Sequence, residues 1–581
     1  MTKIKITPQQ FLTVSALLIG LEGLLCLVYL LSLPSDPKNA VWLGYSANRL
    51  LLAAIILAGV VGALALAWVN WRSGDLVEKL ESAAKADQRR MNYMSLVLGG
   101  ALVLAALALS VRVYIPEIYS ISYQRVLPLL LFVTLALLHS AVLVFSQLEE
   151  KIRRRYLWGM MLVFLTGFYV GSAVYHAFEI NTDGRRSDQV SWVEFSSSVK
   201  NSGFRDTGGR NFMPGYAYLQ AIFVDLEQTV EQQFLSGKLI NIGLSLLILG
   251  GTGLIIRRHL PPLPSFVLLA VIAFNLFVFK AAYYQPELLF YFVYFLIFYL
   301  SLLMLRESNW KVAVLMGLML AVGHYVKASV LPGLLAFAVA FGLKQAVYWW
   351  RERDSRQLLS SLLNLVLTVI IFLTVLSPYL LESKAKYGHY FYNVNTTFYV
   401  WNDNWTQALN TTRLHGDQLG WPDMPPEEIP SFQKYVREHA WEDVITRELS
   451  GLGDVALSLL RPYRMIPYQI LYVILALVLM VVYREMWVDI LRRYWAIFLF
   501  ATFLFPGYYA LFAWYAPISG STARFVSGLF MPFMFAIFLL LERLGEEETH
   551  FRINLAHWVV LALVFIEVFF FIPQRLMELV F

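Results

Sequence analysis

Long runs of apolar residues recur along the whole chain, separated by polar connections. Each run has about 18 or more residues, which is the length that a helix needs to cross the hydrocarbon core of a bilayer. Inside lipid the backbone must satisfy its own hydrogen bonds, so spans of this length are expected to be helices. The pattern predicts an all-α polytopic membrane protein with about 15 transmembrane helices. The predicted spans are 11–33, 47–70, 93–115, 124–146, 157–178, 236–256, 263–280, 287–305, 311–326, 329–347, 360–381, 467–483, 494–514, 522–541 and 555–574.

The polar segments divide these spans into larger parts. Residues 1–150 are expected to form an accessory four-helix transmembrane block, because their spans carry few polar groups. Residues 151–380 form the predicted transmembrane core, and its first outer loop is 179–235. Residues 381–466 are the predicted outer-face segment, a small ordered cap with a helix from about Ser431 to Ser450, and residues 467–581 supply the C-terminal transmembrane helices.

Lysine and arginine residues fall at alternate connections, for example at 151–155, 257–258 and 484–493. Loops rich in these residues lie on the cytoplasmic side of a membrane. The alternation therefore predicts a cytoplasmic N-terminus and places the 179–235 loop, the 323–329 junction and the 381–466 segment on the outer face. We expect an integral protein of the bacterial plasma membrane with its active site on that face.

Composition agrees with a membrane protein and narrows the chemistry. Of the 581 residues, 58% are hydrophobic and 15% are charged, whereas a soluble domain has about 25% charged residues. The one cysteine, Cys26, excludes an intrachain disulfide and a cysteine metal cluster. The net charge of +6 is modest, and the chain has no Walker A loop, Rossmann fingerprint or G-x-S-x-G motif. We expect membrane lipids as partners and no nucleic acid.

A polar island from Asn181 to Val230 stands between two apolar spans. Within it, Asp188 follows Arg185 and Arg186 just past the end of a span. A carboxylate in this position can act as a general base or hold a cation. The alternative is a solvated loop aspartate paired with an arginine. Asp183 and Arg186 are further candidates to support the site.

The same island contains Gly208, Gly209 and Arg210, followed by the Pro214–Gly215 turn signal. A rigid turn would aim Arg210, and arginine suits bidentate contact with a phosphate or carboxylate. The alternative is a connecting turn that starts the next amphipathic segment.

Further candidates follow at the ends of later spans. Lys327 and Arg524 are predicted either to bind a phosphate in a cavity or to extend toward lipid headgroups. Glu287 begins a span, where an acid is also favoured by the helix dipole, and Tyr284 resembles an interfacial aromatic residue. His324 has no metal-site spacing, although carboxylates elsewhere leave Mg²⁺ or Mn²⁺ possible.

The order of these features resembles the GT-C fold glycosyltransferases, in the branch of the protein O-mannosyltransferases and aminoarabinose-lipid A transferases. The resemblance covers about residues 157–545. It rests on Asp188 in the first loop, the segment from Arg210 to Tyr216, Pro286 with Glu287, Gly323 to Lys327, and Arg524 to Pro532.

That resemblance implies a GT-C-like core and a glycosyltransferase that uses a polyprenyl-phosphate-linked sugar. Asp188 would act as general base on an acceptor hydroxyl of a lipid, glycan or protein during inverting transfer. Arg210, Lys327 and Arg524 would bind the phosphate of the donor, where negative charge develops. The alternative functions are a transporter or flippase of an anionic or lipid-linked substrate, which would place ionisable residues near the membrane midplane, and a scaffold without catalytic activity.

Overall fold

The computed structural model describes residues 8–34, 38–73, 82, 88–114, 121–146, 150–208, 211–417, 420, 422–460, 465–519, 523–544 and 547–578. Among them, 13 helices are long and apolar enough to cross a membrane. Two shorter apolar helices, Trp310–Val326 and Ile553–Val568, lie where the sequence predicts the spans 311–326 and 555–574. The prediction of an all-α polytopic membrane protein is confirmed.

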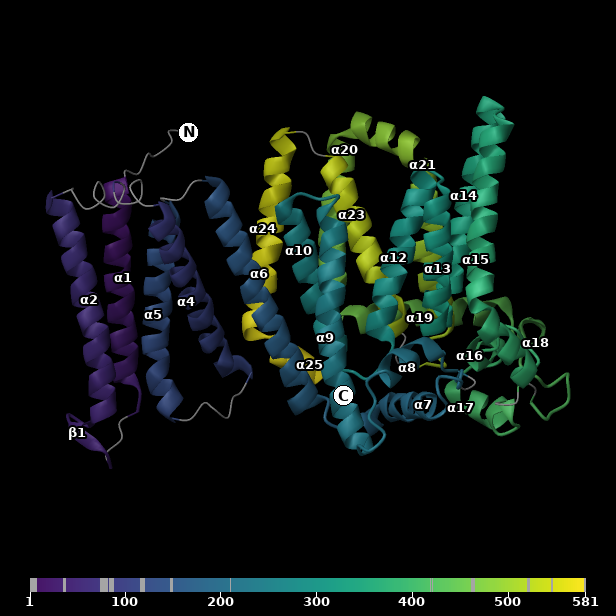
Figure 1. The fold of residues 1–581 in the computed structure, drawn as a ribbon, viewed down its shortest axis with the longest axis horizontal. Coiled ribbons are helices and arrows are strands. Elements are labelled where there is room, and N and C mark those ends of the chain that lie inside the picture. Colours follow the sequence, from purple (N-terminus) through teal and green to yellow (C-terminus); the bar gives the residue numbers. More distant parts are fainter. Residues whose placement is uncertain are drawn as a thin grey trace. The chain divides into compact units, whose positions relative to one another are not determined.

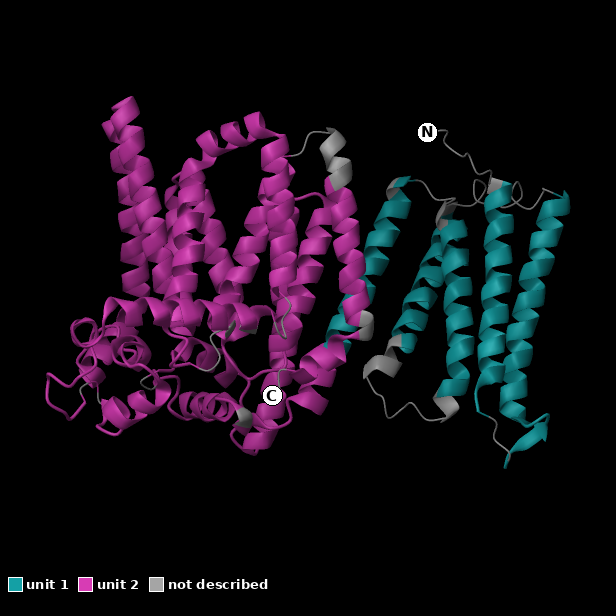
Figure 2. Ribbon diagram, turned by 180° about the vertical axis from the view of Figure 1, so that it is seen from behind, with its two compact units in different colours: residues 1–172 teal, residues 173–581 magenta. Residues whose placement is uncertain are grey.

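The chain divides into two compact units, Met1–Ser172 and Ala173–Phe581 (Figure 2). The first unit extends beyond residue 150, the predicted end of the accessory block, because it includes most of the helix α6. Its described elements are α1 (Pro8–Ser32), β1 (Ala40–Trp42), β2 (Tyr45–Ser46), α2 (Ala47–Ser73), α4 (Gln88–Tyr114), α5 (Ile121–Ser146) and α6 (Glu150–Tyr175). The strands β1 and β2 form a short antiparallel hairpin, a small exception to the all-α prediction.

The core of the first unit includes the side chain of the single cysteine. Cys26 is buried between α1, α2 and α5, where it packs with Leu30, Ile56, Val60 and Phe132. These neighbours are all apolar, so Cys26 acts as a small hydrophobic residue.

Arg49, a residue of the neighbouring helix α2, caps the C-terminal end of α1. Its side chain is fully buried, and its guanidinium donates hydrogen bonds of 2.5 to 3.0 Å to the carbonyl oxygens of Leu30, Leu31, Leu33 and Pro34. The last carbonyls of a helix have no partner within the helix. Arg49 therefore supplies hydrogen-bond donors to the carbonyl groups at the end of α1.

The second unit contains the predicted core from residue 173 onward and the segments that follow it. Its elements up to residue 387 are η2 (His176–Ile180), η3 (Gly184–Arg186), α7 (Gln189–Asn201), α8 (Pro214–Ala221), α9 (Val230–Arg257), α10 (Pro262–Ile272), η4 (Ala273–Phe277), α11 (Val278–Lys280), α12 (Glu287–Arg306), α13 (Trp310–Val326), η5 (Ala328–Val330), α14 (Leu331–Glu352) and α15 (Ser355–Tyr387). The later elements are α16 (Val394–Thr397), η6 (Tyr399–Trp401), α17 (Trp405–Ala408), η7 (Leu409–Arg413), α18 (Phe432–Glu438), α19 (Trp441–Leu460), α20 (Met465–Val482), α21 (Arg484–Trp514), α22 (Ala523–Val526), η9 (Ser527–Leu529), α23 (Phe530–Leu544), α24 (Glu547–Phe570) and α25 (Ile572–Met577).

The long helices of this unit run side by side, and the short helices α7, α8 and α16 to α19 gather at one end of them (Figure 1). The spans formed by α10 with α11, by α12 and by α23 are the most buried, so they form the centre of the bundle. The predicted 381–466 segment has a small core of its own, in which Tyr387, Tyr392, Val394, Phe398 and Tyr399 pack together.

The helix predicted from Ser431 to Ser450 is wrong as a single element. The structure has α18 and α19 with a break at His439 and Ala440. Asp443 causes a new start, since its carboxylate accepts a hydrogen bond of 3.1 Å from the backbone N–H of Ala440. Acceptors of this kind satisfy the free N–H groups at a helix N-terminus.

Candidate functional site

A cavity of about 480 Å³ lies at the end of the bundle where the short helices gather. Asp188, Glu287, His324, Lys327 and Arg524 all line it, although they come from well-separated segments of the sequence. Apolar side chains cover much of the remaining wall; they include Phe212, Met213, Val326, Leu331, Phe391, Leu511, Phe512 and Phe525. The cavity therefore combines a charged cluster with an apolar wall.

Two ion pairs make up the charged cluster. The Arg524 guanidinium lies 3.3 Å from a carboxylate oxygen of Asp188, and the Lys327 ammonium lies 3.1 Å from a carboxylate oxygen of Glu287. The side chains of the first pair are about 30% exposed, whereas that of Glu287 is only 4% exposed. Burial lowers the pKa of Lys327, and the Glu287 carboxylate opposes that shift. Lys327 thus points into the cavity and pairs there, rather than extending toward lipid headgroups.

The ring of Phe525 lies close to both cations. The Lys327 ammonium is 4.5 Å from the ring centroid, and the Arg524 guanidinium carbon is 5.0 Å from it. Phe512 stacks on the same ring at 5.1 Å with an interplanar angle of 5°. The face of an aromatic ring attracts cations, so Phe525 helps to hold both charges at one place in the cavity.

Asp188 owes its position to the start of α7. The side chain of the next residue, Gln189, is fully buried and exchanges two hydrogen bonds of 2.9 Å with the amide of Asn181. Gln189 also accepts a hydrogen bond from the backbone N–H of Tyr284, and Gln285 donates one to Asp188. These contacts fix the start of α7 against the turn that precedes α12.

Buried tyrosines hold the backbone next to the cations. The hydroxyl of Tyr291 in α12 donates to the carbonyl of Arg524 at 2.9 Å. The hydroxyl of Tyr508 in α21 donates to the carbonyl of Ser329 at 3.1 Å, two residues after Lys327. Both cations therefore project from backbone that is fixed by the centre of the bundle.

Five buried polar atoms on the cavity wall have no hydrogen-bond partner among the described residues. They are Trp192 Nε1, Glu287 Oε2, His324 Nδ1, Ser329 Oγ and Arg524 Nε. Most buried polar atoms in proteins are paired. The five unpaired atoms therefore belong to residues that surround the charged groups of the cavity.

Comparisons with protein-family models, with curated proteins and with solved structures give no match to this chain. The chemistry of the site must therefore be inferred from its own residues.

Only part of the motif around Arg210 lies in the described chain, and that part has a structural role. Gly209 and Arg210 lie outside the described residues. Pro214 is the first residue of α8, and a Cβ on Gly215 would lie 2.8 Å from the backbone of Tyr325 in α13. Gly215 thus allows α8 to approach the end of α13 that precedes Lys327.

Two other predicted support residues, Asp183 and Tyr284, lie away from the cavity. Asp183 accepts a hydrogen bond from the backbone N–H of Arg185 and lines a separate cavity of about 540 Å³. Tyr284 is fully buried in a core cluster with Trp192 and Tyr216, so it is not an interfacial aromatic residue. The side chain of Arg186 lies outside the described residues.

The predicted divalent cation, Mg²⁺ or Mn²⁺, finds no ready site in the part of the chain that the structure describes. That part contains no group of three or more His, Cys, Asp or Glu side chains placed to hold a metal ion. The cation stays a prediction.

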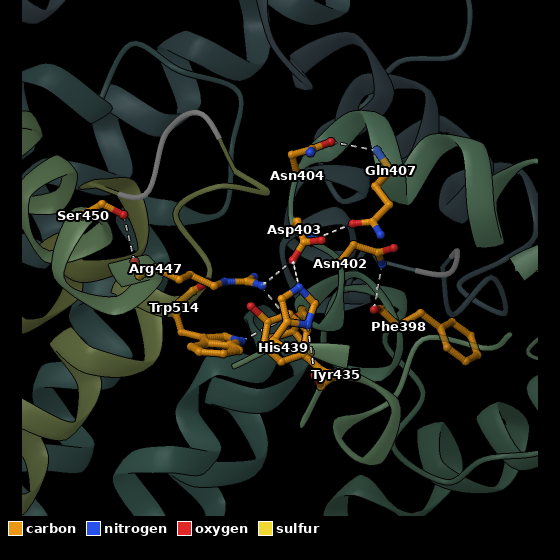
Figure 3. A network of polar contacts seen from close by, with 11 residues as sticks. Phe398, Asn402, Asp403, Asn404, Gln407, Tyr435, His439, Arg447, Ser450 and Trp514 are labelled. Atoms are coloured by element: carbon orange, nitrogen blue, oxygen red, sulfur yellow. Dashed lines mark hydrogen bonds and ion pairs between the residues drawn. The ribbon is translucent and has the colours of Figure 1, made fainter. Parts of the chain in front are cut away.

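A network of polar contacts is centred on Arg447 (Figure 3). The Arg447 guanidinium donates to the carbonyls of Trp514 and Val400 at 3.1 and 3.3 Å, and lies 3.8 Å from the carboxylate of Asp403. His439 pairs with the same carboxylate at 3.0 Å. Val400 lines the cavity, so this network connects α19 and the end of α21 to its wall.

Sequence reasoning missed the residues that position the site. Gln189, Asn181, Tyr291 and Arg447 carry no recognisable motif, because amides, tyrosines and arginines of this kind occur throughout the chain. The only available signal was their position next to a candidate residue or at a span end.

Proposed function

We propose that the protein is a glycosyltransferase that moves a sugar from a polyprenyl-phosphate donor to an acceptor hydroxyl at the outer membrane face. The observation that carries this proposal is the convergence of Asp188, Lys327 and Arg524 on one cavity with a large apolar wall. A lipid-linked sugar phosphate has the matching chemistry, because its phosphate is anionic, its sugar is polar and its lipid is apolar.

In the proposed reaction, Asp188 takes the proton of the acceptor hydroxyl. The hydroxyl oxygen forms a bond to the anomeric carbon of the sugar, and the bond from that carbon to the phosphate oxygen breaks. The electron pair stays on the lipid phosphate, where Arg524 and Lys327 stabilise the negative charge. Attack opposite the leaving phosphate inverts the anomeric centre. The acceptor is a hydroxyl of a lipid, a glycan or a protein.

The ion pair between Asp188 and Arg524 suggests how donor and base are coupled. A donor phosphate competes with Asp188 for the guanidinium, whose Nε is without a partner in the described chain. Binding of the donor then leaves one Asp188 oxygen available for the acceptor proton. The base is thus released where and when the donor is present.

The position of the cavity favours this function over transport of an anionic or lipid-linked substrate. A transporter binds its substrate near the midplane of the bilayer, often between broken helices. Here Glu287 begins α12, Lys327 directly follows α13, and Arg524 lies in the short helix α22. Such an arrangement is suited to a reaction at the interface.

The direct test compares Asp188→Asn with Asp183→Asn in proteoliposomes that contain the purified protein, a panel of polyprenyl-phosphate sugars and candidate acceptors with a free hydroxyl. Release of polyprenyl phosphate is measured, because this product does not depend on the sugar. Loss of a positioned general base is expected to slow release by about 10²- to 10⁴-fold. Asp183→Asn is the matched control, since Asp183 lies five residues earlier outside the cavity. Full activity of Asp188→Asn would remove Asp188 as the base.

In the same assay, Lys327→Ala is expected to raise the donor concentration needed for half-maximal rate more than the acceptor concentration. The reason is that Lys327 is proposed to contact the donor phosphate and not the acceptor. An equal effect on both substrates would contradict this role.

A further inference from the structure

The bundle has a second set of cavities at its opposite end. One cavity of about 270 Å³ lies between α12, α21 and α23, and a neighbouring one of about 240 Å³ shares Arg306, Tyr494 and Ile497 with it. Arg306 ends α12, whereas Glu287 of the first site begins the same helix. A helix of this length spans roughly 30 Å, which is the thickness of the hydrocarbon core. The two sites therefore belong to opposite membrane interfaces.

The lining of this pair of cavities is cationic at its rim. Arg306, Arg543, Arg493 and Lys344 contribute the cations, and His259 lies beside them; neither cavity has a carboxylate among its described lining residues. Partial burial, and then the neighbouring arginines, lower the pKa of His259. The arginines that lower this pKa are Arg306, Arg258 and Arg543.

The interior of the larger cavity is apolar. Its wall is formed by aromatic and aliphatic side chains, including Phe298, Leu302, Phe498, Phe505, Phe533 and Leu540. A soluble anion would gain nothing from this wall. An amphiphile with an anionic headgroup would use both the rim and the interior.

A kink in α21 shapes the junction between rim and interior. Tyr494 has non-helical backbone angles, with φ −118° and ψ 20°, inside the helix. Its hydroxyl accepts a hydrogen bond of 2.7 Å from Arg543, and the Arg543 guanidinium carbon lies 4.7 Å from the centroid of its ring. The kink thus holds an arginine from α23 at the mouth of the cavity.

We propose that these cavities form a binding site for an anionic phospholipid of the leaflet opposite the catalytic cavity. The phosphate lies among Arg306, Arg493 and Arg543, with Lys344 nearby. The first part of an acyl chain enters the aromatic interior between α12, α21 and α23. The rest of the lipid stays in the bilayer, since the cavities are smaller than a whole lipid. This site is independent of the proposed transfer reaction.

A general excess of cations on one membrane face is the competing explanation, because arginine and lysine accumulate in cytoplasmic loops without binding a particular lipid. The chain offers a matched control for it. Lys311 and Arg351 stand at the same end of the bundle and line neither cavity. The double variant Lys311→Gln/Arg351→Gln removes the same charge as Arg306→Gln/Arg543→Gln.

The experiment measures lipid retention by native mass spectrometry on the full-length protein. Phosphatidylglycerol and phosphatidylcholine with identical chains are titrated onto delipidated protein. The unaltered protein is expected to prefer phosphatidylglycerol. Arg306→Gln/Arg543→Gln is expected to reduce this preference on the order of 30-fold, whereas the control pair leaves it unchanged. Ala536→Phe, which fills the apolar wall, is expected to weaken retention of phosphatidylglycerol without changing net charge.

Three results would overturn the proposal. Equal retention of both lipids by the unaltered protein would show that no anionic site exists. An equal loss in the control pair would assign the preference to general surface charge. Inorganic phosphate that stabilises the protein against heat as much as phosphatidylglycerol does would identify a site for a free anion.

Discussion

Asp188, the candidate base, illustrates how much the position of one side chain depends on its neighbours. Its carboxylate meets Arg524 only because Gln189, the next residue, is bonded to Asn181 and to the backbone of Tyr284. A substitution at Gln189 is therefore expected to slow the proposed transfer reaction by displacing Asp188. At this scale the sequence predicted Asp188, Glu287, His324, Lys327 and Arg524, and the structure brings all five to one cavity.

The sequence could not predict the contacts that place these residues. Charged groups stand out in an apolar chain, since each one in or near a membrane is costly and therefore noticeable. A neutral amide such as Gln189 does not stand out in the sequence in this way, because its type does not show whether it is buried. Tyr284 was misjudged for a related reason, because an aromatic residue at a span end looks the same whether it faces lipid headgroups or the interior.

Gly237 in α9 provides a residue-scale test of the packing beneath the site. A Cβ at this position would lie 1.9 Å from the ring of Tyr284, which is itself fully buried against Tyr216. Gly237→Ala is expected to cost about 1–3 kcal/mol of stability, because the ring cannot move without disturbing the core. The midpoint of thermal unfolding in detergent, followed by tryptophan fluorescence, should fall.

Gly243→Ala on the same helix is the control for that measurement. A Cβ on Gly243 meets no atom within 4 Å, and alanine favours helix more than glycine does. Its midpoint should stay the same or rise. Equal midpoints for both variants would contradict the packing assigned to Tyr284.

At the scale of elements, periodicity located the long apolar helices but not the short ones that gather at one end of the bundle. The helices α7 and α8 fill part of a segment that was predicted as a loop, and the predicted 431–450 helix divides into α18 and α19. Short interfacial helices are stabilised by caps and by tertiary contacts. Those contacts join residues far apart in the chain, so a local pattern does not reveal them.

The Arg447 network is the element-scale feature that connects α19 to the cavity wall. Lysine cannot reproduce the planar set of donors that arginine offers, so Arg447→Lys should lose the hydrogen bonds to Trp514 and Val400. We expect a cost of about 1–3 kcal/mol and faster cleavage within 399–460 in limited proteolysis.

Arg437→Lys is the matched control for the Arg447 network. The Arg437 side chain is 68% exposed and lies 3.9 Å from Glu438, in the same part of the chain. A lysine can replace it in that setting at little cost. If both variants resist protease as well as the unaltered protein does, the network does not hold the wall.

At the scale of the whole molecule, the two ends of the helix bundle carry cavities with different chemistry. One end of α12 meets the cavity of Asp188, Lys327 and Arg524, and the other end meets the cationic cavities around Arg306. Hydropathy and length were sufficient to predict the all-α membrane fold. Hydropathy and length did not predict that the first unit ends at Ser172, within α6. This boundary depends on which helices pack against α6, and the composition of α6 does not reveal that.

The predicted sidedness can be tested on the whole molecule with two introduced cysteines. Glu227→Cys lies in the exposed connection before α9, and Ser355→Cys lies at the exposed start of α15. A membrane-impermeant maleimide should label the first variant in intact cells and the second only after permeabilisation. Labelling in the opposite order would place the Asp188 cavity on the inner face.

The buried position of Cys26 gives this protein a property that is useful beyond its fold. Its thiol is enclosed by Leu30, Ile56, Val60 and Phe132, and no second cysteine exists in the chain. An aqueous thiol reagent therefore has no native target while the first unit stays folded. The natural chain is a ready background for spin labels or fluorophores at chosen positions, and reaction at Cys26 itself would report that the first unit has opened.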